Sequence, residues 1–154
     1  IAIKSDLEIK YNIKVEKIAL DFSSFEELNQ KIFKENIFRD LSGILFPVGL
    51  MHEKDNFDLS EVDLRRITFA NYLSIVHTIN YVSKHSNIKG FSVVGFGSVS
   101  GLFGRNLNVS YAAAKRSLES FFEMTFATVI RLETSIKEQE NLAKIVHILY
   151  FKSL

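Results

Sequence analysis

Short apolar segments alternate with segments of helical periodicity, and this order constrains the fold more than any other feature of the chain. The apolar segments, which have the length of strands, are residues 13–20, 43–46, 90–95 and 144–150. The segments with helical spacing are residues 24–32, 60–85 and 110–126. Alternation of this kind predicts an α/β fold with a parallel sheet covered by helices on both faces. Right-handed crossovers make such a sheet doubly wound.

Two of the predicted helices carry start signals in the sequence. Ser24 and Glu27 fit a capping box, in which each side chain accepts a hydrogen bond from a free backbone N–H group. Ser60, followed by Asp63, opens the long helical segment that continues to about His85. These positions predict helices that begin just after Ser24 and Ser60.

Composition limits both the size of the protein and its partners. The chain has 154 residues, of which 47% are hydrophobic, so we expect one domain over residues 1–154 with one core. The net charge is +1, from 19 basic and 18 acidic residues, which favours neither nucleic acid nor an anionic membrane. We therefore expect a small-molecule partner.

Further classes are excluded by what the sequence lacks. It contains no cysteine, which excludes disulfides and thiolate metal sites, and no apolar run near the ~20 residues of a membrane span. Its four histidines lack metal-ligand spacing, so we expect no metal. Residue 1 is not Met and no signal peptide follows, so we expect the central part of a longer cytoplasmic protein.

The segments that follow the predicted strands are the places to look for a site, because ligands of such sheets bind beyond the carboxyl ends of the strands. Asp21 follows the first strand, residues 46–52 follow the second, and residues 97–108 follow the third. The last of these segments is rich in Gly, Ser and Asn and leads into the predicted helix that begins near Ser110.

Tyr111 and Lys115 have a spacing that can carry acid/base chemistry. On a helix they lie one turn apart on the same face, where an ammonium favours the phenolate and lowers the pKa of the phenol. The pair alone is weak evidence, because Tyr-x-x-x-Lys also occurs where an exposed lysine merely packs along a tyrosine. Ser98 and Asn71 are weak evidence by themselves as well. A serine at the end of a strand is often only a turn residue, and an asparagine inside a helix often only bonds to the nearby backbone.

Together these residues are more specific. Gly97-Ser98-Val99-Ser100-Gly101, followed by Tyr111-Ala112-Ala113-Ala114-Lys115 and preceded by Asn71, resembles the Ser loop and Tyr-x-x-x-Lys signature of the short-chain dehydrogenase/reductase family. The resemblance extends over nearly the whole chain. It implies a Rossmann-like fold and an oxidoreductase that transfers a hydride between NAD(P)H and a carbonyl or alcohol. The catalytic residues implied are Asn71, Ser98, Tyr111 and Lys115.

The resemblance also implies a role for each residue. Tyr111 would exchange a proton with the substrate oxygen, which Ser98 would hold in place, and Asn71 would hold a water of a proton relay. Lys115 would lower the pKa of Tyr111 and bind the ribose hydroxyls of the cofactor. Further cofactor contacts would come from Asp21 and Phe22, beside the adenine, and from Gly49.

The family's Gly-rich pyrophosphate turn has no counterpart here, since no Gly precedes Gly43. We expect that the first strand and this turn, roughly 30 to 40 residues, are missing. Residues 95–101 look like a substitute, but the spacing of their glycines is one residue too long.

Residues 46–49 depart from the family as well, because Phe46-Pro47-Val48-Gly49 stands where Asn-Asn-Ala-Gly is usual. This segment is similar to the divergent branch that contains reductases of keto-sugars, which act in polysaccharide and cell-envelope biosynthesis. The family often forms dimers or tetramers, so a homo-oligomer is expected. The altered segment also supports an alternative hypothesis, a non-catalytic Rossmann-like regulatory or assembly module.

Overall fold

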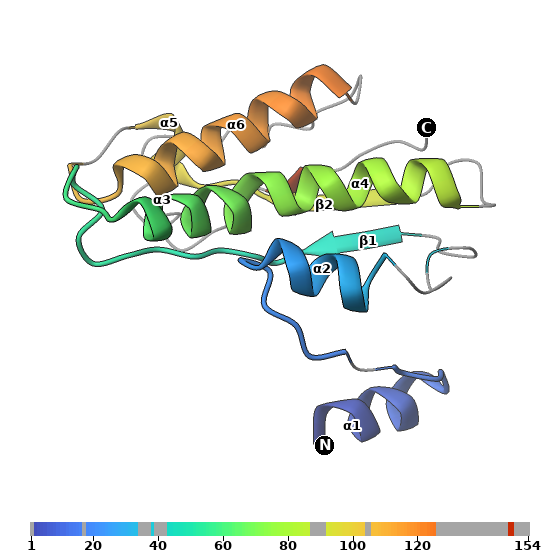
Figure 1. Ribbon diagram of the computed structural model, residues 1–154. Coiled ribbons are helices and arrows are strands. Elements are labelled where there is room, and N and C mark those ends of the chain that lie inside the picture. The colour runs from blue at the N-terminus through green and yellow to red at the C-terminus, as the bar shows by residue number, and fades with distance from the viewer. Residues whose placement is uncertain are drawn as a thin grey trace, which may run out of the picture.

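The computed structural model describes residues 2–16, 18–33, 38, 43–86, 92–103, 106–125 and 148–149. Its elements confirm the predicted α/β class (Figure 1). The helices are α1 (Ala2–Tyr11), α2 (Phe25–Lys31), α3 (Glu61–Thr68), the π-helical η2 (Phe69–Leu73), α4 (Ser74–His85), α5 (Val99–Leu102) and α6 (Val109–Thr125). The strands are β1 (Gly43–Phe46), β2 (Ser92–Phe96) and β3 (Ile148–Leu149). None of the described helices is long and apolar enough to cross a membrane.

β1 and β2 form the parallel pair that the sequence predicts. Gly43 lies opposite Ser92, and Phe46 lies opposite Gly95. The connection between the two strands runs through α3, η2 and α4, as a parallel crossover requires. The carboxyl ends of both strands therefore lie at the same edge of the sheet.

The last predicted strand joins the sheet in the opposite direction. Leu149 and Ile148 pair antiparallel with Gly95 and Phe96 of β2. An apolar run indicates burial but not direction, which depends on the path of the chain between α6 and β3. The prediction of a purely parallel sheet is therefore wrong at β3, while residues 144–147 and 150 of the predicted strand lie outside the described residues.

The first predicted strand, residues 13–20, is also corrected, because residues 13–16 and 18–20 form no strand. A strand needs a neighbour that pairs with its backbone groups. In this segment the Val15 N–H donates instead to Glu8 Oε1, and the Ala19 carbonyl accepts from Lys31 Nζ. The alternation of apolar and polar residues in this segment was therefore not sufficient for a strand, because no described strand pairs with it.

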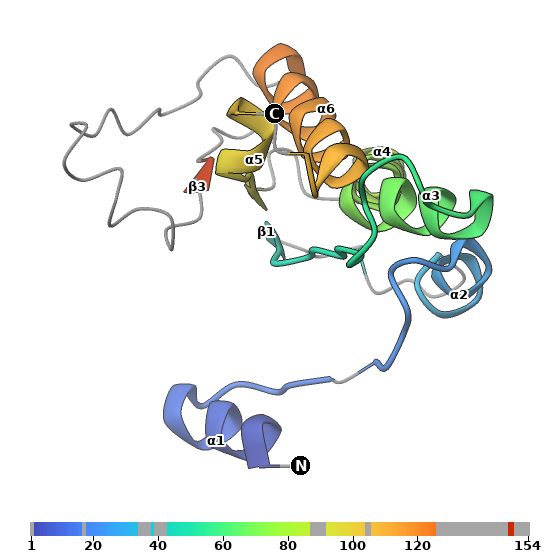
Figure 2. The ribbon, with the colours of Figure 1, turned by 90° about the vertical axis from the view of Figure 1, so that its left-hand side faces the viewer.

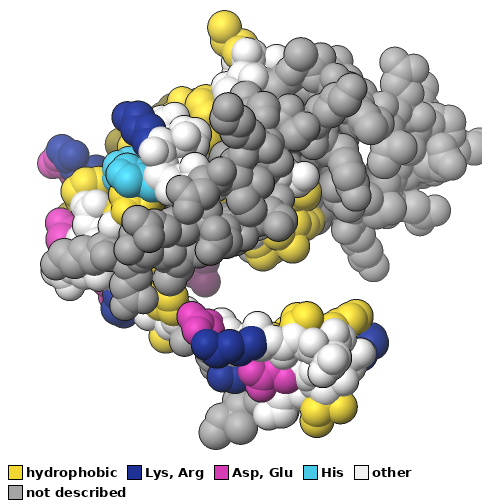
Figure 3. All heavy atoms as spheres, turned by 90° about the vertical axis from the view of Figure 1, so that its right-hand side faces the viewer, with side chains coloured by type: hydrophobic (Ala, Val, Ile, Leu, Met, Phe, Trp, Pro, Cys, Tyr) yellow, Lys and Arg dark blue, Asp and Glu magenta, His cyan; other side chains and the backbone are white. Residues whose placement is uncertain are grey.

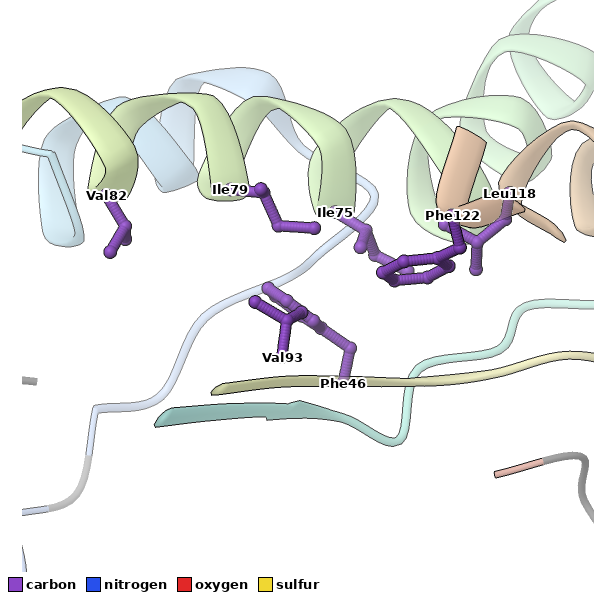
Figure 4. Packing of buried hydrophobic residues seen from close by; sticks show 7 residues of the cluster. All are labelled: Phe46, Ile75, Ile79, Val82, Val93, Leu118 and Phe122. Atoms are coloured by element: carbon purple, nitrogen blue, oxygen red, sulfur yellow. The ribbon is translucent and has the colours of Figure 1, made fainter. Parts of the chain in front are cut away.

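Helices α2, α4 and α6 lie on one side of the sheet (Figure 2). Side chains from α4 and α6 point toward the strands and enclose the core (Figure 4). The buried residues of this core are Phe46, Ile75, Ile79, Val82, Val93, Leu118 and Phe122. Within the described residues, the predicted helical covering of the sheet is thus seen on one face.

Both predicted helix starts are confirmed. Ser24 Oγ accepts from the Glu27 N–H at 3.3 Å, and Glu27 Oε2 accepts from the Asp21 N–H at 3.0 Å. Ser60 Oγ accepts from the Asp63 N–H at 3.1 Å. These contacts are local, which is why the sequence alone could predict them.

The N-terminal helix α1 has no counterpart among the predicted elements. It lies apart from the sheet (Figure 1), and hydrophobic, basic and acidic side chains are mixed on its surface (Figure 3). Lys4 and Glu8 form an ion pair at 3.8 Å, while Ile9 is 82% exposed. The core described above therefore forms without a contribution from Ile9.

We expect Gly95→Ala to destabilise the fold, because a Cβ at this position would lie 2.4 Å from Phe122 Cε2 in the core. Overpacking of this kind costs about 1–3 kcal/mol, measurable as the free energy of unfolding in urea. Gly49→Ala is the control, since its Cβ would meet only Asn71 Oδ1 at 3.8 Å. Adding Phe122→Leu should restore part of the loss in Gly95→Ala, and equal stability of the two single variants would contradict the packing argument.

Candidate active site

The Lys115 side chain joins helix α6 to the carboxyl ends of both parallel strands. Although ionisable, it is only 2% exposed. Its Nζ donates to the carbonyl of Val48, just after β1, at 2.8 Å and to the carbonyl of Phe96, the last residue of β2, at 3.0 Å. An ammonium has three N–H donors, so the contacts in the described part of the chain use two of them.

Burial also changes the protonation of Lys115. Desolvation lowers the pKa of its ammonium to about 8, and the Glu119 carboxylate, one turn further along α6, acts in the opposite direction. A pKa near neutrality suits a group that takes part in proton exchange. The lysine is thus charged at neutral pH but close to its midpoint.

Tyr111 precedes Lys115 by one turn of α6, and the predicted placement on one face is confirmed. Lys115 Nζ lies 5.9 Å from the centroid of the Tyr111 ring, a cation–π distance. Tyr111 is half-buried whereas Lys115 is buried. The phenol is therefore the more accessible member of the pair.

Asn71 lies fully buried in the π-helical turn η2, which interrupts the long predicted helix. Its Nδ2 donates to the carbonyls of Leu50 at 2.7 Å and Ile67 at 2.9 Å, and its Oδ1 accepts from the Leu50 N–H at 3.1 Å. Single π turns are frequent at functional sites. All of these bonds hold backbone groups, so the water-holding role of Asn71 stays a prediction.

Asn71 and Lys115 thus hold two positions of one loop, Leu50 and Val48, with Gly49 between them. Gly49 is exposed, and among the described residues a Cβ added there would meet no atom closer than Asn71 Oδ1 at 3.8 Å. The backbone at Gly49 is therefore open to a ligand. Its place in the cofactor site stays a prediction.

Ser98 begins the short helix α5, which lies within the predicted loop 97–108. Its Oγ accepts from the Ser100 N–H at 3.2 Å, and its own N–H donates to Glu119 Oε1 at 3.4 Å. α5 packs closely on α6, since a Cβ at Gly101 would lie 3.2 Å from the Arg116 backbone nitrogen. The contacts of the described residues thus tie Ser98 to α6 through Glu119 and not directly to Tyr111.

Asp21 and Phe22 occupy a different part of the molecule. Asp21 Oδ1 accepts from both the N–H and the hydroxyl of Ser23, and these bonds hold the pKa of the Asp21 carboxyl below its usual value. Its other oxygen faces Arg66 of α3 at 3.9 Å, while Phe22 packs against the core. Within the described ranges no hydrogen bond or ion pair joins either residue to Lys115 or Asn71.

Two buried carboxylates at the site escaped prediction. Asp55 accepts from the backbone N–H groups of Ser110 and Tyr111 at 2.8 Å each. Nothing in its local sequence indicates this, because its partners are 55 and 56 positions away. Glu119, which is only 6% exposed, carried a usable signal in the sequence, since it follows Lys115 by four positions. The described residues contain no group of three side chains suited to a metal ion.

Comparison with known proteins gives no match to any protein-family model and none to any curated protein. Solved structures do match. A short-chain dehydrogenase from Escherichia coli CFT073, complexed with NADPH, aligns with 80% of this chain at a TM-score of 0.62 and 18% identity. The chain has the short-chain dehydrogenase fold.

Two further dehydrogenases of known structure align in the same way. The bulky-bulky ketone specific alcohol dehydrogenase from Comamonas testosteroni covers 80% of this chain at a TM-score of 0.69 and 15% identity. A 4-hydroxyisoleucine dehydrogenase complexed with NADH and succinate covers 70% at a TM-score of 0.61 and 21% identity. The chain spans 50% to 53% of the length of these three proteins.

The lowered pKa of Lys115 predicts that stability depends on pH. Its pKa falls from 10.5 to about 8 on folding, so between these pH values the unfolded chain binds more protons and stability rises with pH. The free energy of unfolding of wild type, relative to Lys115→Met, should increase by about 3 kcal/mol from pH 8 to pH 10.5. Urea unfolding at several pH values measures this difference, and a difference that does not change with pH would contradict the burial of the ammonium.

Proposed function

We propose that this chain is the central and catalytic portion of an NAD(P)-dependent short-chain dehydrogenase/reductase. The observation that carries the proposal is the contact of Lys115 with the ends of β1 and β2. It brings an ammonium, a neighbouring phenol and an open backbone segment to the edge of the sheet where ligands bind in this fold. The fold supports the same conclusion.

The residues at this edge fit a nicotinamide cofactor. Lys115 offers a third N–H to the ribose hydroxyls, and the exposed backbone at Gly49 allows close approach. Asp21 and Phe22 would contact the adenine. The cofactor supplies the hydride, and its pyrophosphate would need a turn that these residues do not include. One of the similar structures is complexed with NADPH and another with NADH.

In the proposed reduction, the carbonyl carbon gains a hydride while its oxygen gains a proton from the Tyr111 hydroxyl. The resulting phenolate is stabilised by the Lys115 ammonium. Ser98 would hold the substrate oxygen. Its Oγ accepts from the Ser100 N–H, and its O–H donates to none of the described residues. Asn71 fixes Leu50, so the loop beside the reacting atoms keeps its shape.

The substrate class we propose is a keto-sugar, on the basis of the altered segment 46–49, within a homo-oligomeric cytoplasmic enzyme. The alternative is a non-catalytic module of the same fold. It has one observation in its favour, since Phe46 is buried in the core where the family usually has a polar Asn. Cofactor binding separates the two.

Binding of NADH and NADPH to the native full-length protein, followed by nucleotide fluorescence, tests the proposal. We expect saturable binding that Lys115→Met weakens by about 10- to 100-fold, the loss of one charge-assisted hydrogen bond. Gly49→Ala should weaken binding through steric block, because its Cβ would stand on the exposed backbone, 3.8 Å from Asn71 Oδ1. Lys84→Met, at an exposed lysine of α4, is the control and should bind normally. If wild type binds neither nucleotide, the enzyme proposal fails and the module remains.

Turnover tests the role of Tyr111. With cyclohexanone, acetophenone and a keto-sugar as substrate panel, Tyr111→Phe should lower kcat by about 10²- to 10⁴-fold, the usual contribution of a general acid, while the Kd of the nucleotide stays the same. Tyr11→Phe, at an exposed tyrosine that also lies beside a lysine, Lys10, should retain full activity. A fully active Tyr111→Phe variant would remove the phenol from the mechanism.

A further inference from the structure

Asp55 alone satisfies the free N–H groups at the start of helix α6. The first N–H groups of any helix lack partners within that helix. The Val109 N–H donates to the Asp55 carbonyl at 3.0 Å, and the N–H groups of Ser110 and Tyr111 donate to its Oδ1 and Oδ2 at 2.8 Å each. The regular backbone hydrogen bonds of α6 begin with the Ala112 N–H, which donates to the Asn108 carbonyl.

Asp55 is itself held firmly in place. It is fully buried, its N–H donates to the His52 carbonyl at 3.3 Å, and it forms a parallel bridge with Asn108. It belongs to the same loop that Lys115 holds at Val48 and Asn71 holds at Leu50. A carboxylate is also the group that the positive end of a helix favours.

We propose that Asp55 is a positioning residue for Tyr111, which fixes the catalytic phenol by holding the first turn of α6 on the loop after β1. This inference rests on the proposed function, since it assigns Asp55 a part in the same reaction. One of the two carboxylate bonds goes to the backbone N–H of Tyr111 itself. A change at Asp55 therefore moves the first turn before it moves any other part of the site.

The geometry also separates Asp55 from cofactor binding. The loop positions proposed to face the cofactor, Val48 to Leu50, are held by Lys115 and Asn71. Loss of the Asp55 bonds leaves those contacts in place. The effect should therefore fall on kcat and not on the affinity for the nucleotide.

Asp55→Asn and Asp55→Ala test the proposal in the native full-length protein. Asn has the size of Asp but keeps only one acceptor oxygen, so a residue that merely fills space would tolerate it. We expect kcat on the panel above to fall about 10-fold in Asp55→Asn and about 100-fold in Asp55→Ala, the cost of a small misplacement of a catalytic group. The Kd of NADH or NADPH should stay within about twofold.

The second measurement is amide hydrogen exchange, which needs neither substrate nor cofactor. In Asp55→Asn the amides of Ser110 and Tyr111 should lose protection while those later in α6 keep it. Ser60→Ala is the matched control. It removes a cap of another helix, α3, where Ser60 Oγ accepts from the Asp63 N–H, and it leaves the Asp55 bonds to α6 in place. It should leave kcat unchanged.

The outcomes separate this proposal from the proposed function. Loss of kcat with unchanged Kd and faster exchange at Ser110 and Tyr111 supports the role of Asp55. Normal kcat in Asp55→Asn, or an equal loss in Ser60→Ala, overturns it. If wild type shows no turnover, the proposed function fails. Hydrogen exchange then decides by itself whether Asp55 fixes the start of α6, and unchanged protection of Ser110 and Tyr111 in Asp55→Asn overturns that role.

Discussion

The buried ammonium of Lys115 is the interaction on which the rest of the site depends. A charge out of water is costly unless its N–H groups are hydrogen-bonded, and here the carbonyls of Val48 and Phe96 fill that need. Because these carbonyls belong to the ends of two adjacent strands, the bonds fix α6 against β1 and β2 at once. The pKa of about 8 reflects the desolvation of the ammonium, which the Glu119 carboxylate offsets only in part.

The loop after β1 is held at Val48, Leu50 and Asp55. At Val48 and Leu50 the contacts are made to the backbone of the loop. Lys115 binds the carbonyl of Val48, and Asn71 binds both backbone groups of Leu50. Any residue supplies such groups, so these contacts do not require the Asn-Asn-Ala-Gly sequence usual in the family. This explains how Phe46-Pro47-Val48-Gly49 can stand there, with Phe46 used for the core instead. The third position, Asp55, acts through its side chain as well and is therefore sensitive to substitution.

Sequence reasoning succeeded where the contacts are local and failed where they are not. The helix starts at Ser24 and Ser60 depend on partners three residues away and were predicted correctly. Residues 13–20 alternate as a strand should, but the described residues offer no strand beside them. The direction of β3 likewise depends on a distant part of the chain. The π turn at Asn71 was not predicted, since the helical pattern continues through it.

The sequence by itself determined the order of α2, β1, the helical segment from α3 to α4, β2, α6 and β3. It also determined the placement of Tyr111 and Lys115 on one helix face, because helical periodicity fixes neighbours four positions apart. Only the tertiary structure decided what surrounds that pair. The carbonyls that bind Lys115 and the carboxylate that caps α6 come from residues 19 to 67 positions away. Such contacts exist only once the crossover has brought the ends of β1 and β2 together, so no local pattern encodes them.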